Sequence, residues 1–248
     1  MIRNLKVLIA AAMALAAFGA FSATAHALPD EFHCSVEPCY GTLEPDEKAG
    51  TTTAHHVFVV KGKTAAGAEA STSFTCDQLT GTLTLATKTA TEVTVKGDPT
   101  GAPKYENAAG TQKCKVGASE TVEVDMTSCH YQFTAAGGTT DAAEVHVLCS
   151  TVGDGIDIKI NGTLCLQVTP TTATGIGYRT VGTTPNRKIT VTANVALPNL
   201  SLDLKNIGNA NCSALGMAST TGATYTTGNT LVKGLTDPGG LAAEVWYE

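Results

Sequence analysis

Eight cysteines constrain this chain more than any other feature, because all of them follow an N-terminal apolar segment. They are Cys34, Cys39, Cys76, Cys114, Cys129, Cys149, Cys165 and Cys212. An even number of cysteines in an exported chain indicates disulfides, which form and persist in oxidising compartments. A zinc half-site at the first two cysteines is less favoured, because no second Cys or His pair follows at ligand spacing. We therefore predict that all eight cysteines form disulfides.

The pairing is less constrained than the number of cysteines. Pro38 suits a small closed loop between the first two cysteines, and two further bridges would close loops of similar length across neighbouring strands. The predicted pairs are Cys34–Cys39, Cys114–Cys129, Cys149–Cys165 and, by elimination, Cys76–Cys212. The main alternative joins Cys129 directly to Cys149 across one hairpin, if its register is one step longer than we assume.

The N-terminus has the features of a secretory signal. A short basic start precedes an uncharged run from Val7 to Phe21, which is followed by the small-x-small triplet Ala25-His26-Ala27. The apolar run is shorter than the roughly 20 residues that span a bilayer. We therefore predict a signal peptide at residues 1–27 and a secreted mature chain, residues 28–248, that has no membrane anchor.

The charge balance excludes one class of partner. The whole chain has a formal net charge of −6. Loss of Arg3 and Lys6 with the signal peptide removes two positive charges, so the mature chain is at −8. Such an acidic chain does not attract nucleic acid through its net field.

Short runs of alternating apolar and polar residues predict antiparallel strands with one buried face. The clearest runs are residues 122–126, 129–133, 145–149, 156–160 and 189–197. Asn161-Gly162 predicts a two-residue turn that sets Ile158 opposite Cys165, so that both faces of the second strand are covered. These patterns predict an all-β fold, a two-layer antiparallel β-sandwich-like domain stapled by disulfides. Residues 97–103 are either a linker or a long turn, and we favour one domain, because the segment before them offers few large apolar residues.

Several motifs together resemble a known group of proteins. They are Phe32-His-Cys-Ser-Val-Glu-Pro-Cys39, His55-His-Val-Phe58, Phe74-Thr-Cys76, Cys129-His-Tyr-Gln-Phe133 and the C-terminal segment from Asp237-Pro-Gly-Gly240 to Trp246. The chain resembles uncharacterised secreted, disulfide-containing, β-rich proteins of soil actinobacteria over most of its mature length. The resemblance implies export and a cysteine framework, and it implies no activity, cofactor or catalytic residue.

No catalytic motif stands out. The chain has neither a Gly-x-Ser-x-Gly elbow nor a His-Glu-x-x-His pair, and it has no phosphate-binding loop. Two functions remain as hypotheses. The first is a secreted non-catalytic extracellular module that binds a glycan or a protein or is structural, and it implies no cofactor. The second is a secreted hydrolase or metal-dependent enzyme whose site is built from separated strands.

One metal site can be proposed from a hairpin register. If the turn between residues 129–133 and 145–149 is centred on Gly138, His130 lies opposite His146. Directly opposed residues have Cβ atoms about 4.5–5.5 Å apart, so both rings could reach one divalent ion, with Glu144 as a third ligand. The alternative is a solvated polar face, and the register that joins Cys129 to Cys149 would place His130 opposite Leu148 instead.

Overall fold

The computed structural model describes residues 30–45, 56–85, 87–95, 103–117, 119–137, 142–198, 202–238 and 240–248. The predicted signal peptide, residues 1–27, and most of the segment 97–103 lie outside the described residues. Strands make up most of the described part of the chain and helix is almost absent from it, so the all-β prediction is confirmed.

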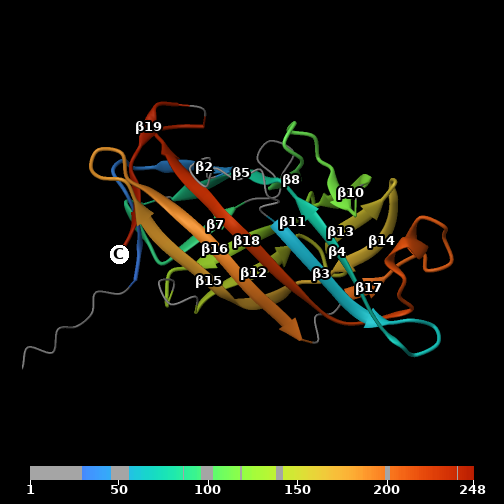
Figure 1. Cartoon of the computed structure of the whole chain (residues 1–248). Coiled ribbons are helices and arrows are strands. Elements are labelled where there is room, and N and C mark those ends of the chain that lie inside the picture. Colours follow the sequence, from blue (N-terminus) through green and yellow to red (C-terminus); the bar gives the residue numbers. More distant parts are fainter. Residues whose placement is uncertain are drawn as a thin grey trace, which may run out of the picture.

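Eight antiparallel strands close on themselves as a barrel (Figure 1). In order around the barrel they are β18 (Ser219–Leu235), β2 (Cys39–Pro45), β5 (Gln78–Leu85), β7 (Glu92–Val95), β11 (Cys129–Thr134), β12 (Ala143–Cys149), β15 (Thr171–Val181) and β16 (Lys188–Pro198), which pairs again with β18. The expected two-layer sandwich is therefore wrong in its architecture. Alternating apolar and polar residues indicate that each strand has one buried face, and this holds in a sandwich as well as in a barrel. The ring is closed only because β18 pairs with both β16 and β2.

A second series of strands extends the wall beyond the closed ring. It consists of β3 (His56–Lys63), β4 (Glu69–Cys76), β9 (Cys114–Val116), β10 (Ser119–Asp125), β13 (Ile156–Ile160), β14 (Thr163–Val168) and β17 (Leu202–Leu204). The 17-residue strand β18 supports both series. Its residues 230–235 pair with β2 and its residues 219–227 pair with β3. The register of β18 on β16 shifts where these two partners change over.

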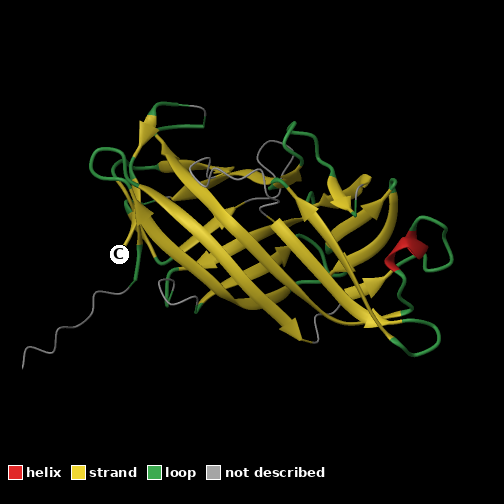
Figure 2. Cartoon of the chain, viewed as in Figure 1, coloured by secondary structure: helices red, strands yellow, loops and turns green. Residues whose placement is uncertain are grey.

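Short elements complete the two ends of the molecule. At the end marked by the carboxyl terminus in Figure 1, a small sheet is formed by β1 (Phe32–Cys34), β6 (Thr89–Ala90) and β20 (Val245–Tyr247). Two further short strands, β8 (Lys104–Glu106) and β19 (Ala242–Ala243), pair with β5 and β18. The single described helix is the 3₁₀ turn η3 (Cys212–Leu215), at the opposite end of the barrel (Figure 2).

The side chains that point inward at every second position of the strands form one continuous core. In β13 the isoleucines 156, 158 and 160 are buried, and the residues between them are partly exposed. The expected pairing of Ile158 with Cys165 is wrong, because a β-bulge between Ile158 and Lys159 sets Ile158 opposite Leu166. A bulge inserts one unpaired residue, which lets two neighbours turn inward. Cys165 and Leu166 are accordingly both fully buried.

The structure contains four disulfides, and their pairing corrects most of our predicted set. Cys34–Cys39 is confirmed, whereas the other bridges are Cys76–Cys114, Cys129–Cys149 and Cys165–Cys212. The predicted pairs Cys114–Cys129, Cys149–Cys165 and Cys76–Cys212 are wrong. The cause is the register of the hairpin formed by β11 and β12, in which residues 129 and 149 lie directly opposite each other. The bridge from residue 76 to residue 114 joins the adjacent strands β4 and β9.

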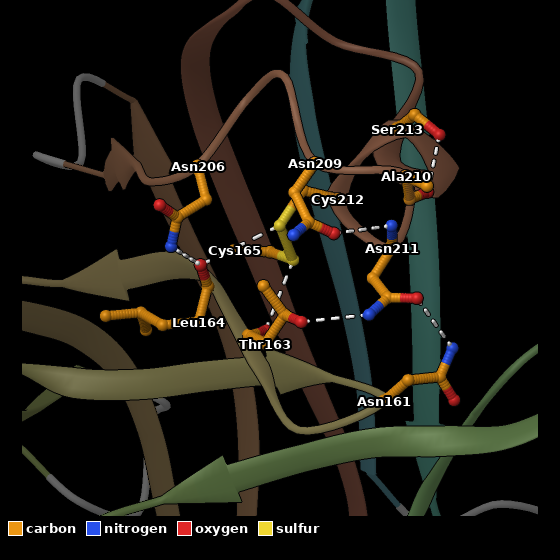
Figure 3. The surroundings of a disulfide bond; sticks show 10 residues. All are labelled: Asn161, Thr163, Leu164, Cys165, Asn206, Asn209, Ala210, Asn211, Cys212 and Ser213. Atoms are coloured by element: carbon orange, nitrogen blue, oxygen red, sulfur yellow. Dashed lines mark hydrogen bonds between the residues drawn. A yellow bond between two sulfur atoms is a disulfide. The ribbon is translucent and has the colours of Figure 1, made fainter.

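The Cys165–Cys212 bridge fastens a loop rich in asparagine onto strand β14 (Figure 3). Asn206 donates a hydrogen bond from Nδ2 to the Leu164 carbonyl at 2.9 Å, and Asn211 donates from Nδ2 to the Thr163 hydroxyl at 2.8 Å. The bridge and these contacts hold η3 against the end of the barrel, where Leu215 is buried.

Candidate functional site

The structure does not bring the predicted metal ligands together as expected. Because Cys129 lies opposite Cys149, His130 pairs with Leu148 and His146 pairs with Gln132. The assumed register was therefore wrong, and the two imidazoles are not opposed. His146 instead contacts its neighbours, with Nδ1 at 2.8 Å from the Thr172 hydroxyl and Nε2 at 3.5 Å from a Glu144 carboxylate oxygen.

The described residues contain no group of three or more His, Cys, Asp or Glu side chains that could hold a metal ion. Each of the eight cysteines is in a disulfide, which leaves no thiol as a nucleophile. No helix in the described ranges is long and apolar enough to cross a membrane.

The most distinctive feature of the molecule is an apolar cavity inside the barrel, with a volume of about 160 Å³. Its wall is formed by inward-facing side chains of both strand series. At one end it reaches Phe32 and Val245 of the small sheet, and at the other it reaches Leu166 and Leu202. The cavity therefore extends along the barrel. Its lining includes no Lys, Arg, Asp or Glu.

Small inward side chains explain why the cavity exists. The two neighbouring strands β15 and β16 contribute Ala173 and Ala193 to the wall, with Val191 and Val195 beside them. A closed eight-stranded barrel has an interior just wide enough to be filled by side chains or to hold one small ligand. Alanine and valine do not reach the axis of such a barrel, so space remains between opposite walls.

An aromatic cluster forms one part of the wall. Phe58 stacks on Phe74 with ring centroids 4.8 Å apart, and Tyr225 lies 4.7 Å from Phe58 on another side. Tyr105 completes the cluster in an edge contact with Phe58 at 5.1 Å. Such edge and offset contacts stabilise aromatic pairs beyond the area that they bury.

A hydrogen-bonded chain of polar groups runs through this cluster. His56 Nδ1 lies 2.7 Å from the Tyr225 hydroxyl, Tyr225 is hydrogen-bonded to Tyr105, and the Tyr105 and Tyr131 hydroxyls are 3.0 Å apart. Burial raises the pKa of Tyr131 to about 12 and raises the pKa of Tyr105 well above its usual value. These phenols therefore stay neutral at physiological pH.

Tyr178 is the exception among the buried tyrosines. Its ring is part of the cavity wall and only 5% of the residue is exposed. Its hydroxyl is the one buried side-chain polar group in the described residues that has no hydrogen-bond partner. Buried polar groups in native proteins are nearly always paired, so this hydroxyl needs an explanation.

Sequence reasoning missed this site. Tyr131 lies in the alternating run 129–133, whereas Tyr178 and Tyr105 lie in none of the runs named from the sequence. A usable signal was the presence of small inward residues such as Ala173 and Ala193 in two neighbouring strands, because such residues do not fill a wide interior. That signal has meaning only once closure of the barrel is known.

The fold and the cavity together define a class, a disulfide-bonded antiparallel β-barrel with an apolar interior. No protein family, curated protein or solved structure matches this chain.

Proposed function

We propose that this protein is a secreted, non-catalytic module that carries a small apolar molecule inside its barrel. One observation carries the proposal, the cavity of about 160 Å³ with its almost wholly apolar wall. An engineered apolar cavity of about 150 Å³ in another protein stays dry and binds benzene, so a void of this size and chemistry is a competent site. Ligand sites are typically concave and apolar, with a few polar groups that fix orientation.

Export fits the same function. The four disulfides are typical of proteins that work in oxidising surroundings, and residues 1–27 have the pattern of a signal peptide. Two of the bridges, Cys76–Cys114 and Cys129–Cys149, join adjacent strands, and disulfides stabilise a fold by restricting its unfolded chain. No arrangement of described residues favours the alternative of a hydrolase or metal-dependent enzyme.

A titration of the exported, disulfide-bonded protein with ethylbenzene tests the proposal. Ala193 lines the cavity and is 7% exposed, whereas Ala196 on the same strand faces solvent. Ala193→Leu places an isopropyl group in the void, and we expect it to weaken binding by about tenfold or more, the equivalent of about 1.4 kcal/mol. Ala196→Leu is the matched control and should bind as the wild type does.

Calorimetry measures the affinity, and circular dichroism checks that each variant is folded. Ligand binding should also raise the unfolding temperature, and the increase should follow the logarithm of the ligand concentration once that concentration exceeds the Kd. A wild-type protein that binds no small apolar molecule, or an Ala193→Leu variant that binds as tightly as the control, would refute the proposed function.

A further inference from the structure

Strand β18 lines the cavity along much of its length. Its side chains at positions 223, 225, 227, 230 and 232 belong to the wall, and most of them pair with β16 residues that line it too. Successive strand residues rise about 3.3 Å, so the path from Ala223 to Val232 covers about 30 Å of strand. Figure 1 shows β16 and β18 crossing the barrel diagonally. With the tilt of about 35–45° that is usual in closed barrels, this path spans about 20 Å along the barrel axis.

The volume of the cavity is small for that length. A round cavity of about 160 Å³ would be only about 7 Å across. A void of the same volume that follows the axis for about 20 Å is much longer than it is wide. The cavity is therefore a narrow channel. It suits a long, thin molecule, whereas a short, broad one would have to push apart side chains that are already closely packed.

The wall presents apolar surface along the channel. Val191, Ala193 and Val195 line it from β16, and Val145 and Val147 line it from β12. The described wall has no Lys, Arg, Asp or Glu, and an unpaired charge in an apolar interior is strongly disfavoured. A bound molecule therefore gains most from methylene groups that follow one another along the channel, because each of them buries apolar area.

We propose that the molecule carried in the barrel is an unbranched aliphatic chain that lies extended along the barrel axis. The inference rests on the proposed function, and it narrows the small apolar molecule to the class of straight-chain compounds. A thin chain keeps the wall within van der Waals contact on every side, which dispersion attraction requires. The flat ethylbenzene molecule still fits such a channel, whereas a globular hydrocarbon is too wide for it.

Two hydrocarbons of the same formula test the shape of the channel. n-Hexane is a straight chain, whereas its isomer neohexane is globular because it has a quaternary carbon. Headspace gas chromatography measures how much of each binds to the full exported protein. We expect n-hexane to bind at least about tenfold more tightly than neohexane. Each methylene added from n-pentane to n-octane should tighten binding by about fourfold, because it buries further apolar area.

A substitution in the middle of the channel tests whether the chain lies along it. Ala193 pairs with Thr227, midway along the β18 path, so Ala193→Leu divides the channel. We expect this variant to weaken n-octane binding by about tenfold or more and n-pentane binding by less than about threefold, because the shorter chain fits on one side of the new group. Ala196→Leu, on the solvent side of β16, is the control and should keep the full gain up to n-octane.

Three results would overturn the inference while leaving the carrier function intact, provided that ethylbenzene binds. They are equal binding of neohexane and n-hexane, a gain that already ends at n-pentane in the wild type, and an Ala193→Leu variant that weakens n-octane no more than n-pentane. Circular dichroism checks that each variant is folded. A wild-type protein that binds none of these hydrocarbons overturns the inference and the carrier function together.

Discussion

Removing the Tyr178 hydroxyl should stabilise the ligand-free protein. Tyr178→Phe keeps the ring contacts with Phe32 and Tyr247 and deletes only the buried hydroxyl that has no partner among the described residues. Leaving such a group unsatisfied typically costs about 1–3 kcal/mol. We therefore expect the free energy of unfolding to rise by about 1–3 kcal/mol. For a chain of this size, each kcal/mol corresponds to about 2–4 °C in the unfolding temperature.

Tyr247→Phe is the matched control, and its expected effect has the opposite sign. The Tyr247 hydroxyl donates to the carbonyl of Ala135, which is fully buried. Its removal leaves that carbonyl without this donor, which should destabilise the protein by about 1–3 kcal/mol.

Both variants are unfolded thermally and in urea with their disulfides intact, and circular dichroism follows the transition. A Tyr178→Phe variant that is no more stable than the wild type would refute the reasoning, because it would mean that the hydroxyl is already satisfied. Equal changes in both variants would show that ring packing, rather than hydrogen bonding, controls this region.

Two further predictions concern the disulfides and the response to acid. Replacing both Cys165 and Cys212 by Ala opens a loop with a sequence separation of 47, and the chain-entropy relation then predicts that the free energy of unfolding falls by about 4 kcal/mol. Urea denaturation of the variant and the wild type measures this loss, and a loss below about 1 kcal/mol would contradict the prediction. Although burial opposes the shift, hydrogen bonds from Lys159 and Thr127 lower the pKa of Asp125 from 3.8 to about 2. A lowered folded-state pKa stabilises the protein above the unfolded value, so this contribution should be lost as the pH falls from about 4 to about 2. Lys159→Met should flatten that part of the stability profile, and an unchanged profile would argue against the pairing.

The amino-acid sequence alone was enough to predict an all-β fold with disulfides, although not the barrel architecture. Alternation in runs such as 156–160 and 189–197 depends only on which residues face the core, and both runs are strands in the structure. The pairing of Cys34 with Cys39 was also predictable, because a loop that short has few alternatives. These features are local in the chain, and local patterns are what a single sequence records.

The register of one hairpin needed the tertiary structure. A register shift of two residues separates the expected pairing from the observed pairing of Cys129 with Cys149, and it also moves His130 from His146 to Leu148. Period-two alternation is nearly the same in both registers, so the sequence does not distinguish them. The alternative register, which joins Cys129 to Cys149, was the correct one. The proposed metal site depended on the other register, which is centred on Gly138.

The cavity was decided by tertiary structure alone. It exists because β18 pairs with β16 on one side and with β2 and β3 on the other, which closes a wide ring around small side chains such as Ala173 and Ala193. Which strands become neighbours depends on contacts between residues far apart in the chain, and no local pattern encodes them. The sequence alone did not indicate where the side chain of Tyr178 would lie. Only the closed barrel determined that its hydroxyl would be buried there without a partner among the described residues.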